Sequence, residues 1–304
     1  MSTLKKTENN LGQDEKVRSL WKQSVIQFKH NRLAVVGLLI IVLFIVTILT
    51  TLAVDQITNY SFYNEYIIKQ DLSLRLAKPS LAHPFGCDEF GRDLLLRILW
   101  GTKLSFAIGV VAIALSVIMG APFGMIAAFY GGKTDNAIMR VMDVLLAVPY
   151  MLLAMAIVAA LGTSTFNLLL ALAVSGIAKY ARIARAAVLT VKDSEFVEAA
   201  RAVGASDGTI LFQYILPNAL APILVQVSLG IGDSILAVAG LSYLGLGVQP
   251  PQPEWGAILT TARTYMRDAW HISVFPGLFL ILAVIAFNLF GDGLRDALDP
   301  KLKR

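Results

Sequence analysis

Four long stretches of the 304-residue chain contain no Asp, Glu, Lys or Arg. They are residues 33–54, 104–130, 144–165 and 272–291. A helix that crosses the hydrocarbon core of a bilayer needs about 20 predominantly apolar residues, and each stretch is long enough. Because a bilayer satisfies no backbone hydrogen bonds, such stretches must form helices that pair their own polar groups. The chain is therefore expected to cross a membrane several times.

Two further stretches have the length of a span but a less uniform composition. Residues 166–189 are apolar in their first half and basic in their second, and residues 219–247 carry one charge, Asp233. Only 15% of the chain is charged, against roughly 25% in soluble domains. The expected fold is an all-α polytopic membrane protein with six transmembrane helices.

The N-terminal part predicts a retained anchor rather than a cleaved signal. Residues 1–32 are polar, and the apolar run that follows is too long for the core of a signal peptide. Residues 1–19 lack apolar periodicity and are expected to be loose, whereas residues 21–32 alternate basic and apolar side chains, as in a helix at the membrane surface. Cys87 is the only cysteine, which excludes an intrachain disulfide.

Lys and Arg predict the orientation, because cytoplasmic loops are enriched in them. If both termini are cytoplasmic, the segments on the cytoplasmic side contain more Lys and Arg than the segments on the outer side. The predicted segments are a cytoplasmic N-terminal segment (1–32), a first transmembrane helix (33–54), an extracytoplasmic loop (55–103), a core of five transmembrane helices (104–291, with a cytoplasmic loop at 190–218) and a cytoplasmic tail (292–304). Three cations count against this orientation, and we expect a helix lying along the membrane surface to carry them: Arg92, Arg97 and Lys103.

The loop at 190–218 has the pattern of two short helices. Asp193 or Ser194 can cap the first helix, and Gly204 can end it in a left-handed conformation. Ser206 and Asp207 can cap a second helix over 207–215, which Pro217 is expected to close. Small residues crowd the first helix, so its backbone can approach another protein closely. The alternative is an ordinary connecting loop.

This loop also resembles a known signature. Glu198-Ala199-Ala200, with Gly204 and Leu216-Pro217 at the expected spacing, is similar to the EAA motif of ABC importer permeases. Tyr214 stands where the motif has isoleucine. Other segments resemble the dipeptide/oligopeptide/nickel permease group in the same order: 83–93, 130–132, 139–143, 204–207, 216–218, 241–247, 250–256 and 293–300. The run at 250–256 favours the dipeptide branch.

The resemblance implies a type I ABC importer permease of the bacterial cytoplasmic membrane. A second homologous permease completes the path, two ATP-binding subunits use ATP and Mg²⁺, and an extracytoplasmic binding protein delivers a dipeptide or oligopeptide. Nickel or a metallophore is the alternative substrate. This chain is then expected to bind lipid, no nucleic acid and no cofactor or metal, and to catalyse no reaction. The resemblance places ATPase coupling at Glu198, Ala199, Ala200, Arg201, Gly204, Ala205, Ser206, Asp207, Leu216 and Pro217.

Asp233 is the sharpest candidate for the translocation path, because a charge in mid-span is costly and usually faces a pathway or a partner. The alternative is a structural hydrogen bond to another helix. Many members of the family carry an acid one turn later, where Ala237 stands here. Ser228 and Ser234 are candidates on the same helix. Since Asp233 is the only central charge, a self-sufficient secondary transporter is disfavoured.

Other motifs carry weaker signals. Residues 127–134 fit a relaxed phosphate-loop pattern, but an apolar span precedes them where such a loop needs a strand. Arg140 and Asp143 are expected to form a local ion pair, with a gate contact as the alternative. Trp255, with Glu254 beside it, can be an interfacial anchor or a contact for the binding protein. The three scattered histidines and the absence of a nucleophile cluster disfavour a membrane enzyme.

Overall fold

Five helices of the computed structural model, which describes residues 20–298, are long and apolar enough to cross a membrane. They are α3 (Arg32–Ile57), α4 (Leu94–Tyr130), α7 (Thr165–Leu189), α10 (Leu216–Tyr243) and α12 (His271–Leu298). The described residues contain helices and turns but no β-sheet, so the all-α prediction is confirmed. The segment that was expected to be loose, residues 1–19, lies outside the described residues, as do residues 299–304.

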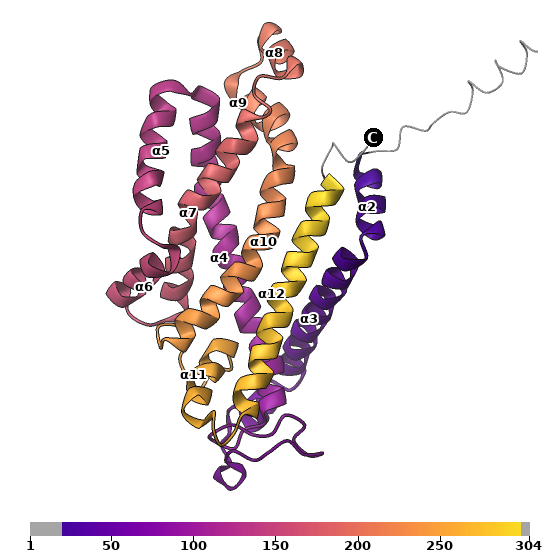
Figure 1. The fold of residues 1–304 in the computed structure, drawn as a ribbon, viewed down its shortest axis with the longest axis vertical. Helices are drawn as coiled ribbons and strands as arrows, with labels where there is room; N and C mark the ends of the chain where they lie inside the picture. Colours follow the sequence, from indigo (N-terminus) through magenta and orange to yellow (C-terminus); the bar gives the residue numbers. More distant parts are fainter. Residues whose placement is uncertain (1–19, 299–304) are drawn as a thin grey trace, which may run out of the picture.

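The third predicted span differs from its prediction. In place of one helix over 144–165, α5 (Gly132–Leu146) and α6 (Tyr150–Leu161) form a pair bent by 80°, which counts as a sixth span only if the two are taken together. The break falls at Pro149, which has no N–H and disfavours a helical residue before it. Residues 132–143, which lie between two of the predicted spans, belong to α5 and lie along the bundle (Figure 1).

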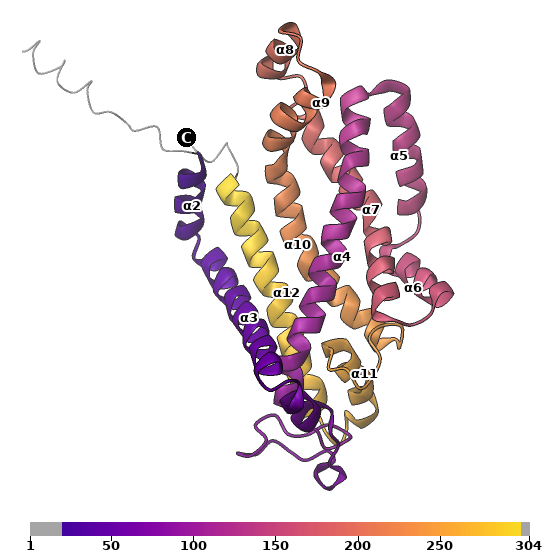
Figure 2. The ribbon, with the colours of Figure 1, turned by 180° about the vertical axis from the view of Figure 1, so that it is seen from behind.

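The long helices pack through glycine. At Gly120 and Gly124 of α4, an added Cβ would overlap the backbone carbonyl oxygens of Ile177 and Ala181 on α7. Small residues let two membrane helices approach to backbone contact, which increases their van der Waals packing. Figure 2 shows α4 running beside α7 over much of its length. This pair forms the rigid centre of the bundle.

The two ends of the bundle are different. At one end lie α2 (Leu20–His30), the last turns of α12 and the short helix α8 (Glu195–Ala202). At the other end lie residues 58–93 and α11 (Trp255–Tyr265), a helix that the sequence pattern did not indicate (Figure 1). α2 confirms the helix predicted over 21–32 and contacts α12. The last span also continues seven residues beyond its predicted end at residue 291, to Leu298.

Pro217 does not end a helix, contrary to the prediction. α9 (Asp207–Thr209), a π-helical turn η3 (Ile210–Ile215) and α10 follow one another without a break. The backbone N–H of Leu216 donates to the carbonyl of Leu211, five residues earlier, so the ladder changes register just before the proline, which has no N–H to place. Of the two short helices predicted in 190–218, the first is α8 and the second is the start of a span.

Candidate coupling segment and translocation cavity

The coupling segment, residues 190–218, contains one well-defined helix, α8, between α7 and α10. Ser194 stands in extended conformation before it. At its end, the N–H of Gly204 donates to Arg201 and that of Ala205 donates to Ala200, both at about 3 Å. This is the Schellman pattern, and Gly204 has the positive φ (84°) that it requires. The predicted start and stop of this helix are confirmed, but the Ser194 side chain does not cap it, because its Oγ donates to the carbonyl of Val191 instead.

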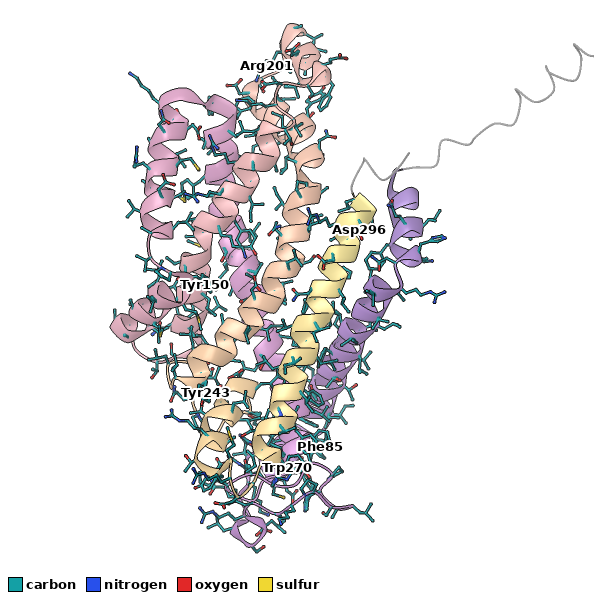
Figure 3. All side chains as sticks on the ribbon, in the orientation of Figure 1. Phe85, Tyr150, Arg201, Tyr243, Trp270 and Asp296 are labelled. Carbon is teal, nitrogen blue, oxygen red and sulfur yellow. The ribbon has the colours of Figure 1, made fainter. Side chains whose placement is uncertain are left out.

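One face of α8 is buried and the other is exposed. Val197 and Ala200 join an apolar cluster with residues from the ends of α4, α7 and α10, so α8 is fixed to three long helices. Glu198 and Ala199 are exposed on the opposite face, and Arg201 lies at the end of the molecule (Figure 3). Val203 is 83% exposed. The segment therefore presents small, apolar and charged groups outward from a rigid base.

The residues assigned to coupling by resemblance lie at this end but differ in burial. Ala200 is buried in the apolar cluster, and Ala205 and Leu216 are half-buried. Ser206 accepts a hydrogen bond from the N–H of Thr209 and so caps α9. The exposed members are Glu198, Ala199, Arg201, Gly204, Ser206, Asp207 and Pro217.

A cavity of about 1780 Å³ lies beside the coupling segment and extends into the bundle. α7 and α10 provide most of its wall, and α4, α5, α6, α12 and the coupling segment, including Phe196 of α8, provide the rest. Along α10 the lining runs from Pro217 to Ala237, about 30 Å at 1.5 Å per residue. Beyond this point, buried Val238 and Leu241 pack with Ile108 of α4 and close the space toward α11. The cavity thus reaches inward from the α8 end.

Asp233 lies in this cavity. Its side chain is 67% exposed, and its Oδ2 is 3.4 Å from Nζ of Lys179 on α7. Both candidate serines are buried. Ser234 is part of the cavity lining although it is only 1% exposed, whereas Ser228 is not part of the lining and its Oγ donates to the carbonyl of Leu224 within α10. Lys179 was not predicted as a site residue, because it is one of three cations in the basic half of the predicted span 166–189 and Asp233 lies 54 residues away. The available signal was a cation within an apolar span.

The basic residues of α7 nearest the coupling segment are paired with α5. Arg182 donates to Asp143 at 2.6 Å, and Arg185 makes two hydrogen bonds of 2.6 Å to Asp135. The predicted Arg140–Asp143 pair is therefore wrong, because Arg182 of the neighbouring helix takes the carboxylate. These contacts attach the bent third span to α7.

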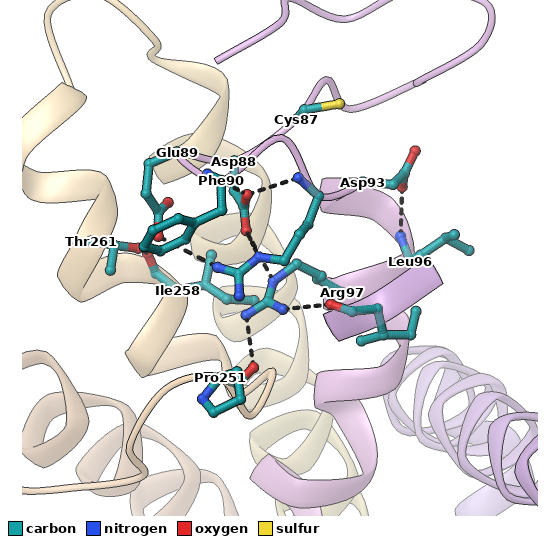
Figure 4. Close-up of polar contacts among 12 residues, drawn as sticks. Cys87, Asp88, Glu89, Phe90, Asp93, Leu96, Arg97, Pro251, Ile258 and Thr261 are labelled. Atoms are coloured by element: carbon teal, nitrogen blue, oxygen red, sulfur yellow. Dashed lines mark hydrogen bonds and ion pairs between the residues drawn. The ribbon is translucent and has the colours of Figure 1, made fainter. Parts of the chain in front are cut away.

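At the other end, charged residues form a buried cluster (Figure 4). Asp88 accepts from Arg92 at 2.7 Å and lies 3.2 Å from Nε of Arg97. Arg97 also donates to the carbonyls of Ile67 and Pro251, and so joins three separate segments. Arg92 lies just before α4 and Arg97 in its second turn, so the predicted surface helix is wrong. Burial among carboxylates and carbonyls explains these cations instead.

Lys103, the third of these cations, pairs with Asp55 at the end of α3, and Trp100 donates to the same carboxylate. Glu89 of the cluster is different, because neither of its buried carboxylate oxygens has a hydrogen-bond partner among the residues that the structure describes. Burial, together with the nearby charge of Asp88, raises the pKa of Glu89.

Glu254 and Trp255 are fully buried, so neither of the predicted roles at a surface holds. The Glu254 carboxylate caps α11 by accepting from the N–H groups of Gly256 and Ala257, and it also accepts from Ser105 of α4. The Trp255 indole donates to the carbonyl of Ile98. The pair joins α11 to α4 in the core.

Two family models match the chain. Residues 120–304 match "Binding-protein-dependent transport system inner membrane component", and residues 19–79 match "N-terminal TM domain of oligopeptide transport permease C". The first match contains all the motif segments described above except 83–93, which lies between the two matches.

Similar proteins cover almost the whole chain. The dipeptide transport system permease protein DppC of Alkalihalophilus pseudofirmus is 44% identical over 94% of this chain and 91% of its own length. The glutathione transport system permease protein GsiD of Pectobacterium atrosepticum is 42% identical over 95% of this chain and 94% of its own. A chain of the inward-facing methionine ABC transporter MetNI, only 18% identical, superposes with a TM-score of 0.56 over 68% of this chain and 98% of its own length, and shows the same fold.

Proposed function

Because this chain belongs to the binding-protein-dependent transport system inner membrane component family, we propose that it forms half of the membrane pathway of an ATP-driven importer of short peptides. The position of α8 carries this proposal. α8 is packed on the ends of α7 and α10, and these two helices form most of the cavity wall. A force applied to α8 from outside the membrane therefore acts directly on the walls of the cavity.

The exposed face of α8 is the docking site for an ATP-binding subunit in this proposal. Small Ala199 allows close backbone approach, and Glu198 and Arg201 offer charges of both signs. Movement of the docked subunit tilts α7 and α10 as rigid bodies, because helices transmit displacement along their length. The cavity then opens at alternate ends.

The substrate class follows from the relatives. The similar permeases are named for dipeptide and glutathione transport, which supports a short peptide over the nickel alternative. The cavity agrees with this class, because it is mostly apolar with a few charged groups at fixed positions. Such a lining tolerates varied side chains while providing partners for the constant polar groups of a peptide.

The partners and orientation belong to the same proposal. A second, different permease subunit completes the pathway, two ATP-binding subunits dock at the α8 end, and a binding protein docks at the end that carries residues 58–93 and α11. α8, α2 and the end of α12 then face the cytoplasm. The chain binds no cofactor and catalyses no reaction, since the partner ATPases use ATP and Mg²⁺.

Substrate class is tested by uptake in cells with and without a functional copy of this chain. We expect deletion to abolish uptake of a labelled dipeptide, excess unlabelled dipeptide to compete with it, and nickel to have no effect. Unchanged dipeptide uptake in the deletion strain, together with lost nickel uptake, would establish the alternative substrate.

A further inference from the structure

We propose that Lys179 and Asp233 form a transit subsite for the two charged ends of a short peptide. Asp233 binds the α-ammonium group and Lys179 binds the α-carboxylate. The inference rests on the proposed peptide import and adds to it the residues that recognise the substrate inside the membrane.

The contact between these two residues is weak. A single distance of 3.4 Å joins them, and both side chains are well exposed to the cavity, 46% for Lys179 and 67% for Asp233. Exposed ion pairs of this kind contribute little to stability. α7 makes two other ion pairs, Arg182–Asp143 and Arg185–Asp135, and both are shorter at 2.6 Å. Of the three, the Lys179–Asp233 contact is the one that a ligand separates most easily.

The position of the pair is also unusual. Asp233 lies 17 residues into α10, which is about 25 Å from its start. Charged groups at this depth are costly unless they face water or a partner, and they commonly mark a substrate path. Asp233 is the only carboxylate among the described residues that line the cavity. A cationic group that enters the cavity therefore meets one anionic partner.

The chemistry of peptides matches this pair. Side chains vary from one peptide to another, but every free peptide has one ammonium and one carboxylate terminus. An extended dipeptide spans about 7 Å, so its ends reach both residues once the side chains separate. Around the pair the wall is apolar and aromatic, with Ile113, Tyr150 and Leu236 in the lining. The charges hold the termini, and the wall accommodates the variable side chains.

Equilibrium binding of a tritiated dipeptide tests the subsite. The probe is added to the membrane complex of the importer in nanodiscs, without its binding protein, so that recognition by that protein does not contribute. We expect Asp233→Asn and Lys179→Met each to weaken binding about 10-fold, since each removes a charge-assisted contact. Arg182→Gln is the matched control, because Arg182 lines the same cavity but is paired with Asp143 at 2.6 Å. The affinity of this variant for the dipeptide should stay within about 2-fold of that of wild type.

Blocked peptides identify which residue binds which end. An N-acetylated dipeptide has no ammonium group, so its binding should not change in Asp233→Asn but should weaken in Lys179→Met. A dipeptide amide should show the reverse. The subsite would be overturned if each variant lost the same affinity for free and for blocked dipeptides. It would also be overturned if the wild-type complex bound no measurable dipeptide. Uptake of dipeptide by cells, measured separately, shows whether the proposed import itself holds.

Discussion

At the scale of single residues, Gly124 determines how closely two spans approach. A Cβ at this position would overlap the carbonyl oxygen of Ala181, so even Gly124→Ala must push α4 away from α7. Overpacking of this kind costs about 1–3 kcal/mol. We expect a clearly lower Tm for the purified protein. Gly277→Ala is the control, because an added Cβ there meets nothing within 4 Å. Equal Tm values for the two variants would contradict the close packing.

Glu89 gives a prediction about pH. Because burial and Asp88 raise its pKa, folding favours the protonated form, so the stability that Glu89 contributes is present below the pKa of the unfolded side chain, about 4.3. That contribution is lost as the pH rises through the higher folded pKa. Glu89→Gln, which cannot ionise, should therefore raise Tm at pH 8 and have a smaller effect at pH 5.

The pH series of Tm for wild type and variant checks this sign. Both proteins are unfolded by heating in the same detergent at each pH. A variant that is less stable than wild type at pH 8 would instead show that the 3.5 Å contact from Arg92 to Glu89 outweighs the cost of burial.

At the scale of elements, the end of α8 depends on one backbone conformation. Gly204 has a φ of 84°, and its N–H donates to Arg201. Proline fixes φ near −65° and has no N–H, so Gly204→Pro should distort the end of α8 and reduce peptide uptake at least about 10-fold. Gly204→Asn is the matched control, because asparagine tolerates the left-handed region. If both variants transported normally, the shape of α8 would not matter for coupling.

Charge reversal on the exposed face separates docking from folding. Glu198 is exposed and makes no ion pair within the described residues. Glu198→Lys should leave Tm and the amount in the membrane unchanged but reduce ATP-driven uptake strongly. Normal uptake by this variant would remove Glu198 from the docking surface.

The sequence pattern predicted some elements well and others poorly, for identifiable reasons. α3 was predicted closely because charge-free length and hydropathy depend on the segment alone, and α7 starts within one residue of its prediction although its second half is basic. Pro149 lies inside a predicted span, where a proline indicates a kink, but the 80° angle of the bend depends on tertiary context. The continuous helix through Pro217 also depends on context, because a π-turn accommodates a proline that composition alone reads as a stop. α11 was not predicted because it lies in a stretch too short and too polar for a span. Glu254, which caps it, is a charged residue that the sequence alone places at a surface, although it is buried in the structure.

In the candidate site too, local features were predicted and contacts between helices were not. Local spacing predicted where α8 starts and stops, because both are set within a few residues, but the predicted cap is not made by the Ser194 side chain. The partner of Asp233 was not predicted, because Lys179 lies 54 residues away and only the packing of α7 against α10 brings it near. Likewise Asp143 pairs across helices with Arg182 rather than along its own helix.

At the scale of the whole molecule, the two ends have different chemistry. The end with residues 58–93 is held by a buried network of charges around Asp88 and Arg97, which fixes several segments together. The end with α8 opens into the cavity and presents an exposed face. This asymmetry is consistent with a pathway that is closed at one end and driven from the other.

The most direct test of the account is reconstitution into liposomes. A labelled dipeptide is supplied with the binding protein outside, and ATP with Mg²⁺ inside. We predict that the peptide accumulates only when this chain, its partner permease and both ATP-binding subunits are present, and that omitting the ATP-binding subunits or ATP abolishes accumulation. Accumulation by this chain without the ATP-binding subunits would contradict the account.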